Sequence, residues 1–266
     1  MTNVAIFGVS GRMGRCVVRA IRESVDFRLT GALASPTSAS LGRDAGEVAM
    51  AGPAAVDVTA NREQALAMAA IAIDFTLPEA LADNLAAVAR AGIPIVIGVT
   101  GLDAARQVEL RSASERLPVL VAPNMSLAAN LLFGLAGRAA AALPPDYDVE
   151  ILETHHRAKA DAPSGTALRL GEIVAGARGG TLAERAVYGR LGKSATRAAG
   201  AIGFASLRGG DIVGHHQVLF AGVGETIELV HRATDRMTFA HGALAAARWL
   251  MGRPPGLYGM SDVLGL

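Results

Sequence analysis

Short apolar runs alternate with amphipathic stretches along the first 125 residues of the chain. Apolar runs of the length of buried strands occupy residues 3–7, 28–34, 56–59, 70–76, 92–100 and 117–123. Helical periodicity fills most of the intervals, up to about residue 24, at 62–69, 78–91 and 102–115. Strands that alternate with helices predict right-handed β-α-β units and a parallel, Rossmann-type sheet.

The rhythm changes after Asn124. A long apolar helix is predicted at 126–143, and extended segments follow at 148–156, 201–208, 211–220 and 225–233. This spacing predicts a second, α+β domain whose open sheet is mixed or antiparallel and has helices on one face. A last helix at 238–251 is expected to pack back on the first domain. Residues 176–200, rich in glycine, alanine and arginine, are predicted to form a long loop.

Three glycines follow the first apolar run and open the first predicted helix. They form the pattern G-x-x-G-x-x-G between a strand and a helix. In this context Gly8 allows a tight turn, Gly11 lets a pyrophosphate approach the backbone, and Gly14 lets the helix pack close to the strand. The helix amides then face the phosphates. The sequence therefore predicts a dinucleotide site made of Gly8, Val9, Ser10, Gly11, Arg12, Met13 and Gly14.

The carboxyl ends of later strands extend this site, because parallel sheets bind ligands there. Phe75, at the end of the fourth predicted strand, is expected to form a wall of the site. Ala34 and Ser35 end the second strand, where an acidic residue would bind the ribose of NADH. Side chains that could still hold the 2′-phosphate of NADPH are Arg12, Ser35, Thr37 and Ser38. We therefore expect weak discrimination between NADPH and NADH.

Residues 150–168 concentrate proton-transfer and anion-binding side chains. The segment EILETHHRAK predicts a strand that runs into a loop. Because alternate residues share a face, one side of it is expected to carry Glu153, His155, Arg157 and Lys159. His155 and Lys159 can then converge on one bound molecule, while His156 points away or joins them once the strand frays.

The following segment, DAPSGTAL, has the features of a helix start. Asp161 or Ser164 can cap the helix, and Pro163 suits its first turn. Gly165 lets the backbone approach a ligand. Since helix N-termini bind carboxylate or phosphate, the sequence predicts an anion-binding turn beside a proton-donating histidine.

This segment resembles the signature of the 4-hydroxy-tetrahydrodipicolinate (dihydrodipicolinate) reductase family. The pattern E-x-x-E-x-H-x-x-x-K-x-D-x-P-S-G-T-A is met in full by Glu150, Glu153, His155, Lys159, Asp161, Pro163, Ser164, Gly165, Thr166 and Ala167. Ala158 stands where many members have histidine, at a position outside the pattern. Members also often have an acidic residue and an arginine at positions 34 and 35. The resemblance extends from the glycine loop to the tail GLYGMSDVL.

The resemblance implies an NAD(P)H-dependent oxidoreductase of the diaminopimelate route to lysine. It would reduce a cyclic, imine-like dicarboxylate, with His155 as proton donor and Lys159 as cation. The substrate carboxylates would be held by His156, Ser164, Gly165 and Thr166, together with Lys159. The nicotinamide half of NADPH or NADH would lie against Gly98, Val99, Thr100, Ala122, Pro123, Asn124 and Met125. Residues 1–126 with 237–266 would bind the dinucleotide, and 127–236 the substrate. The second domain's sheet would build a homotetramer.

Composition narrows the other possibilities. The net charge is +1 without a basic run, so no nucleic-acid partner is expected. No uncharged apolar stretch reaches the roughly 18–20 residues that span a bilayer, and the N-terminus lacks signal-peptide features. Cys16 is the single cysteine, and no metal-ligand cluster is evident. We expect a cytoplasmic protein that needs no membrane and no metal.

Two alternatives remain open from the residues alone. One is a related two-domain dehydrogenase of another amino or keto acid, which leaves the segment HHRAK…PSGT unexplained. The other is a non-catalytic nucleotide sensor, for which the proton donor His155 would have no use.

Overall fold

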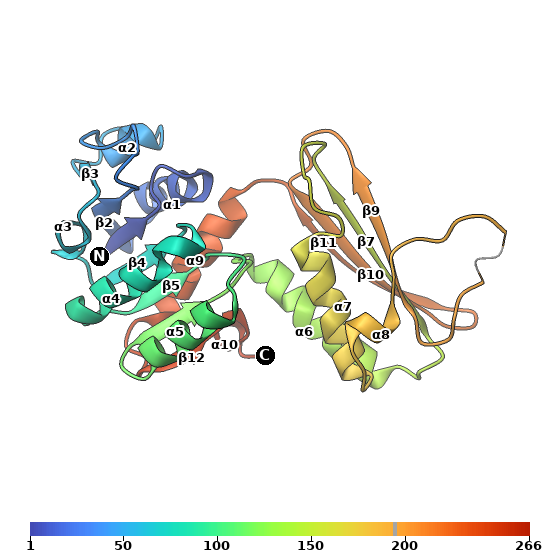
Figure 1. Ribbon diagram of the computed structural model, residues 1–266. Coiled ribbons are helices and arrows are strands. Elements are labelled where there is room, and N and C mark those ends of the chain that lie inside the picture. Colours follow the sequence, from blue (N-terminus) through green and yellow to red (C-terminus); the bar gives the residue numbers. More distant parts are fainter. Residues whose placement is uncertain (194–195) are drawn as a thin grey trace. The chain divides into compact units, whose positions relative to one another are not determined.

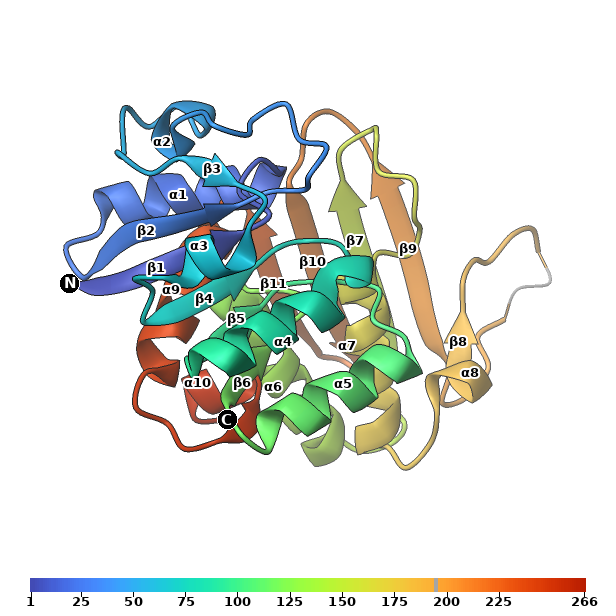
Figure 2. The ribbon, with the colours of Figure 1, turned by 60° about the vertical axis from the view of Figure 1, so that its left-hand side comes forward.

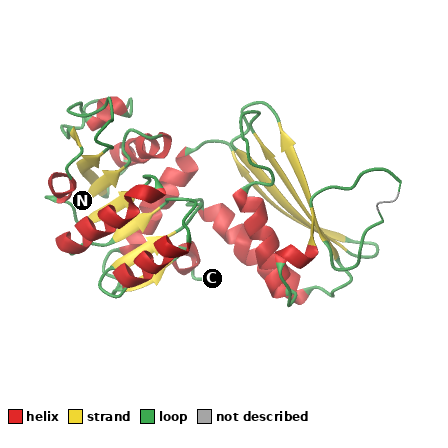
Figure 3. Ribbon diagram, viewed as in Figure 1, coloured by secondary structure: helices red, strands yellow, loops and turns green. Residues whose placement is uncertain are grey.

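The computed structural model describes residues 1–193 and 196–266, which form two compact units (Figures 1 and 3). Unit 1 comprises Met1–Leu127 and Arg236–Leu266, and unit 2 comprises Ala128–Asp235. Unit 1 is thus built from both ends of the chain. The last long helix, α9 (Met237–Leu250), packs against the first, α1 (Arg12–Glu23), within this unit.

Unit 1 contains a seven-stranded sheet in which all neighbouring strands are parallel. Its order is β12-β6-β5-β4-β1-β2-β3. The strands are β1 (Thr2–Phe7), β2 (Phe27–Leu33), β3 (Val58–Thr59), β4 (Ile71–Asp74), β5 (Ile95–Ile97), β6 (Pro118–Val121) and β12 (Gly256–Tyr258). The Rossmann-type sheet is confirmed. The edge strand β12 was not predicted, because its three residues are too few to form a recognisable pattern.

Helices cover both faces of this sheet (Figure 2). They are α1, α2 (Ala45–Val48), α3 (Arg62–Leu66), the 3₁₀ turn η1 (Pro78–Ala80), α4 (Leu81–Ala91), α5 (Ala104–Ser114), α9 and α10 (Met260–Leu264). Strand β1 shows why: Val4 and Ile6 pack on the side of α1 and α9, and Ala5 and Phe7 on the side of α4. The part of a strand that is buried on both faces is apolar, as residues 4–7 of β1 are.

Unit 2 contains a mixed five-stranded sheet of order β11-β10-β7-β9-β8. Its strands are β7 (Asp148–His155), β8 (Ala186–Val187), β9 (Ile202–Arg208), β10 (Gly214–Ala221) and β11 (Thr226–Ala233). The central strand β7 is antiparallel to β10 and parallel to β9, which confirms the open mixed sheet. Helices α6 (Leu127–Ala142) and α7 (Gly165–Ala177) pack on one face, on Ile151, Phe204 and Phe220.

The end of β7 differs from the prediction in one respect. The strand stops at His155, and the backbone turns: the Arg157 amide bonds to the Gly210 carbonyl and the Lys159 amide to that of His156. The expectation that Arg157 and Lys159 continue the face of Glu153 is therefore wrong. The Lys159–His156 bond is local, whereas the carbonyl that accepts from Arg157 lies more than fifty positions away in the sequence.

The start of α7 is also corrected in detail. Ser164, not Asp161, is the N-cap, and its hydroxyl accepts a hydrogen bond from the Ala167 amide. The Asp161 carboxylate binds Lys159 instead. Pro163 precedes the cap, after a cis peptide bond, and so lies outside the first turn.

The predicted loop at 176–200 is partly structured. It contains the end of α7, the short helix α8 (Leu182–Arg185) and the strand β8. Residues 194 and 195 lie outside the described residues.

Candidate active site

The carboxyl end of β7 carries two titratable side chains on the helix-covered face of its sheet. Glu153 is 1% exposed and His155 is 8% exposed. The Glu153 Oε2 atom lies 2.5 Å from His155 Nδ1. The alternation of the strand therefore places these two side chains together, as a buried carboxylate–histidine dyad.

Arg208, on the neighbouring strand β9, binds the carboxylate of the dyad. Its two terminal nitrogens donate to the two Glu153 oxygens at 2.8 and 2.7 Å. The parallel register pairs His155 with Arg208, which brings the guanidinium beside the carboxylate. Sequence reasoning assigned no role to Arg208, because strand register is set by pairing that the local pattern does not reveal.

These contacts fix the charges of the dyad. Burial alone would raise the pKa of Glu153, but hydrogen bonds from Arg208 and His155 outweigh it and lower that pKa to about 2. Burial lowers the pKa of His155, and the hydrogen bond to Glu153 opposes this shift. With the carboxylate at Nδ1, the other ring nitrogen, Nε2, is the one that can exchange a proton with a ligand.

Gly214 on β10 borders that nitrogen. A Cβ atom at this position would lie 3.2 Å from His155 Nε2. The glycine therefore leaves the proton-exchanging side of the ring less crowded than any other residue type would.

A second histidine, His216, lies beside the dyad and was not predicted as a site residue. Its ring contacts His155 edge-on, with centroids 5.0 Å apart, and its Nε2 lies 3.2 Å from Ser164 Oγ. Burial lowers the pKa of His216 to about 3, so the ring is neutral. The segment GHHQVLF held a usable signal, since alternation places His216 on the same face as Val218 and Phe220.

The first turn of α7 joins this cluster. The Ser164 amide donates to Glu153 Oε1 at 3.2 Å, so the cap of the helix is tied to the dyad. Gly165 opens the helix, is exposed, and has open space where a Cβ would stand. A ligand carboxylate can therefore approach the helix start at Gly165 and Thr166.

The other predicted substrate residues follow the strand. His156 is half-buried directly after β7. Lys159 lies in the turn beyond it, with Nζ donating to both Asp161 oxygens at 2.7 and 2.8 Å. That hydrogen bond lowers the pKa of Asp161. Lys159 is thus paired to a carboxylate whose side chain is largely exposed.

The glycine loop in unit 1 has the geometry that its spacing predicted. Gly8 has a φ of +80°, and a Cβ there would lie 2.7 Å from the Phe75 carbonyl oxygen. A Cβ on Gly14 would lie 2.2 Å from the Gly8 carbonyl oxygen. Gly11 is the N-cap of α1 and is exposed. The backbone is therefore a compact cradle at a helix N-terminus, which suits a pyrophosphate.

A pocket of about 440 Å³ adjoins this cradle. Predicted cofactor residues that line it are Gly8, Ser10, Gly11, Ser35 and Phe75. Arg12 and Met13 lie in the first turn of α1. Five others are buried and could offer mainly backbone to a ligand, namely Val9, Gly14, Val99, Ala122 and Met125. Gly98 and Thr100 follow β5, and Pro123 and Asn124 follow β6, at the same edge of the sheet.

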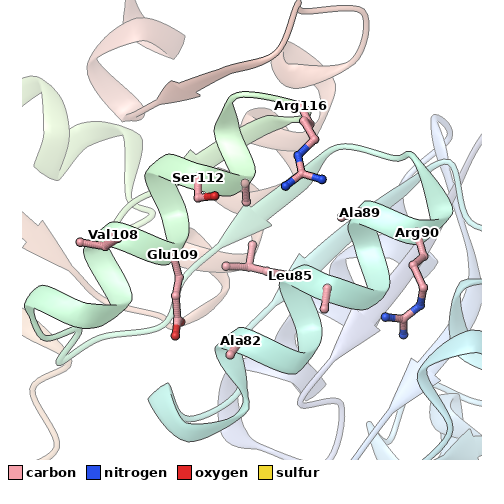
Figure 4. Close-up of a pocket in the computed structure, with 10 residues that line it drawn as sticks. Ala82, Leu85, Ala89, Arg90, Val108, Glu109, Ser112 and Arg116 are labelled. Carbon is pink, nitrogen blue, oxygen red and sulfur yellow. The ribbon is translucent and has the colours of Figure 1, made fainter.

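The Phe75 ring packs over Gly98. A Cβ on Gly98 would lie 2.2 Å from that ring, so only glycine fits there. Figure 4 shows a separate pocket of about 650 Å³ between α4 and α5. None of the predicted site residues lines it. Its Leu85 and Val108 give it an apolar wall, with Arg90 and Arg116 beside them.

Two kinds of feature are absent among the described residues, a group of metal ligands and a membrane-spanning helix. Within 1–193 and 196–266, no three or more histidine, cysteine or carboxylate side chains are grouped to hold a metal ion. Among the described helices, none combines the length and apolarity that crossing a membrane requires.

Comparison with known proteins identifies the family. Residues 2–125 match the family model described as dihydrodipicolinate reductase, N-terminus, and residues 128–264 match its C-terminus. A 4-hydroxy-tetrahydrodipicolinate reductase from Thiobacillus denitrificans is 53% identical, covering 99% of this chain and 98% of the relative. One from Pseudomonas fluorescens is 48% identical over the full length of both chains.

A solved structure supports the same assignment. The dipicolinate-bound dihydrodipicolinate reductase from Paenisporosarcina sp. TG-14 has a TM-score of 0.78 and 27% identity, covering 98% of this chain and 99% of that one. Both family models, these relatives and this fold agree over the whole length, and the chain belongs to the dihydrodipicolinate reductase family.

Proposed function

We infer that this chain reduces 4-hydroxy-tetrahydrodipicolinate to tetrahydrodipicolinate with NADPH or NADH, in the diaminopimelate route to lysine. The observation that carries this inference is the family match over both units, at 53% identity to a named reductase. The intact dyad at His155 and the glycine cradle of unit 1 supply the chemistry that this reaction needs.

Substrate binding is proposed for the loop after β7 and the start of α7. A dicarboxylate, dipicolinate, is the ligand named for the Paenisporosarcina structure. In this chain one carboxylate would meet the amides of Gly165 and Thr166 and the Ser164 hydroxyl. The other would meet His156 and Lys159, whose ammonium would then exchange the exposed Asp161 carboxylate for the substrate. Charge-assisted hydrogen bonds of this kind fix both position and orientation.

Cofactor binding is proposed for the glycine cradle and the pocket beside it. The bound nicotinamide supplies a hydride at its C4 atom. The residues of unit 1 bind and orient the cofactor: the helix start at Gly11 takes the pyrophosphate, and the loops after β5 and β6 border the nicotinamide.

His155 is proposed as the proton donor. Glu153 holds Nδ1 and so directs Nε2 towards the space beside Gly214. When hydride reaches the imine-like bond, negative charge builds on the adjoining ring atoms, and protonated His155 neutralises it by donating from Nε2. Such a positioned acid typically contributes about 10²–10⁴ in rate.

Location and assembly are further parts of the proposal. We infer action in the cytoplasm, the source of reduced nicotinamide for biosynthesis, and a homotetramer formed through the helix-free face of the unit 2 sheet. That face carries exposed apolar side chains, including Leu207 and Val230.

The test is oxidation of NADPH or NADH, followed by absorbance, on adding the condensation product of pyruvate and aspartate semialdehyde. We expect turnover with the wild-type chain and a kcat loss of about 10²–10⁴ in His155→Ala with little change in KM. No turnover by a folded wild-type sample would refute the function. Near-normal kcat in His155→Ala would refute only the role of that histidine.

A further inference from the structure

The pocket beside the glycine cradle lacks a charged residue at the end of β2, where cofactor-binding patterns place one. It is lined by Ala34 and Ser35 at the end of β2, where the adenosine ribose of a bound dinucleotide is recognised. Neither side chain carries a charge. Arg62, the first residue of α3, lines the same pocket and carries a positive charge.

Arg62 is held in place by a buried polar network. Its Nε donates to Asn84 Oδ1 at 2.8 Å. Asn84 is fully buried, and its Nδ2 donates to Asp74 Oδ2 at 2.8 Å and to Thr76 Oγ1 at 3.1 Å. The Thr76 amide in turn donates to Asp74 Oδ1 at 2.8 Å. The edge of the guanidinium that carries Nε is thus anchored, so its orientation is fixed by buried groups.

The terminal nitrogens of Arg62 make weaker contacts than its Nε atom. Nη2 lies 3.4 Å from Asp83 Oδ2, whose side chain is 73% exposed, so this ion pair is weak. Nη1 has no hydrogen-bond partner among the described residues. Arg62 is the only cation among the described residues that line this pocket. A planar fork with two available nitrogens is the donor that suits a phosphate best.

We propose that Arg62 binds the 2′-phosphate of NADPH and supplies the NADPH affinity that Ala34 and Ser35 do not. This proposal rests on the proposed function, because it requires a dinucleotide in the pocket. The chain would then accept both cofactors, with Arg62 recognising the phosphate and contributing little to NADH binding. The cation would come from α3 rather than from the end of β2.

The test compares Arg62→Gln with the wild type in kcat/KM for each cofactor. Loss of a charge-assisted hydrogen bond should raise the KM for NADPH roughly tenfold or more, while the KM for NADH stays within about twofold. Calorimetric titration with 2′-phospho-AMP and with AMP should show the same split. Arg90→Gln is the matched control, since Arg90 is also paired to a carboxylate, Glu63 at 2.6 Å, but does not line the pocket.

The other outcomes overturn the proposal. Equal losses for NADPH and NADH would mean that Arg62 contacts the shared adenine or supports the fold, and unchanged values would mean that it does not reach the cofactor. If Arg62→Gln does not fold, Arg62→Lys keeps the charge but not the fork, and the proposal then requires a selective, smaller loss with NADPH. Wild-type turnover with NADH separates failure of this proposal from failure of the function itself.

Discussion

At the scale of single residues, the proposed chemistry rests on how Glu153 sets the protonation of His155. The carboxylate is kept charged by Arg208, and it holds one nitrogen of the imidazole. A general acid works only in its protonated form, so activity should fall as the pH rises through the pKa of His155. Burial lowers the pKa of His155, and the hydrogen bond to Glu153 raises it.

Glu153→Gln should therefore move the basic limb of the kcat–pH profile to lower pH. The substitution removes the charge that favours imidazolium, so the pKa of His155 falls further and less acid is present at neutral pH. The measurement is kcat against pH under saturating substrate and cofactor. Because the position of the limb does not depend on how much enzyme is active, partial unfolding would not mimic the shift.

Glu150→Gln is the control for this experiment. Glu150 lies on the same strand, faces the other side of the sheet, and is paired to Arg190 at 2.8 Å. The Glu150→Gln substitution should leave the kcat–pH profile unchanged. An unchanged limb in Glu153→Gln, or an equal shift in both variants, would show that Glu153 does not set the pKa of His155.

At the scale of elements, the start of α7 combines a structural cap with a proposed binding role. The Ser164 hydroxyl accepts from the Ala167 amide at 3.3 Å, and lies 3.2 Å from His216. Ser164→Ala should lower the free energy of unfolding by about 0.5–2 kcal/mol, the usual value of an N-cap. It should also raise the KM for the substrate roughly tenfold, since the hydroxyl is proposed to contact a carboxylate.

Asp103→Ala separates the two effects. Asp103 caps α5 in unit 1 by accepting from the Arg106 amide at 2.8 Å, at a helix without proposed ligand contacts. Denaturant unfolding and steady-state kinetics of both variants are the measurements. We expect similar losses of stability but a raised KM only in Ser164→Ala. A raised KM in both variants would mean that it follows stability alone.

The elements also show what could be predicted from the sequence. Strands such as β1 and β7 could be predicted from local apolar runs or from alternation. The start of α7 could be predicted from the pattern of residues at 150–168. Alternation could indicate that His216 faces the core, but not that His216 and Arg208 lie beside the dyad. Arg208 and His216 reach Glu153 and His155 through strand pairing across more than fifty residues. Lys159 was misplaced because the strand ends at His155 and the chain then turns, with the Lys159 amide bonded to the His156 carbonyl.

At the scale of the whole molecule, the unit 2 sheet has one face that its own helices do not cover. Cross-strand pairing places Thr154 and Leu207 on that face, and likewise Gln217 and Val230. Leu207 is 52% exposed and Val230 is 40% exposed. Apolar side chains on an uncovered sheet face favour burial against another copy of the chain, which agrees with the proposed homotetramer.

Leu207→Asp should therefore dissociate the assembly. A carboxylate buried at an interface without a partner costs several kcal/mol, more than most interfaces tolerate. Light scattering after size exclusion should give four chains of 27.2 kDa for the wild type and a smaller species for the variant. Met68→Asp, at a 63% exposed apolar residue of unit 1, is the control and should remain tetrameric. A monomeric wild type would refute the tetramer, and a tetrameric Leu207→Asp would place the interface elsewhere.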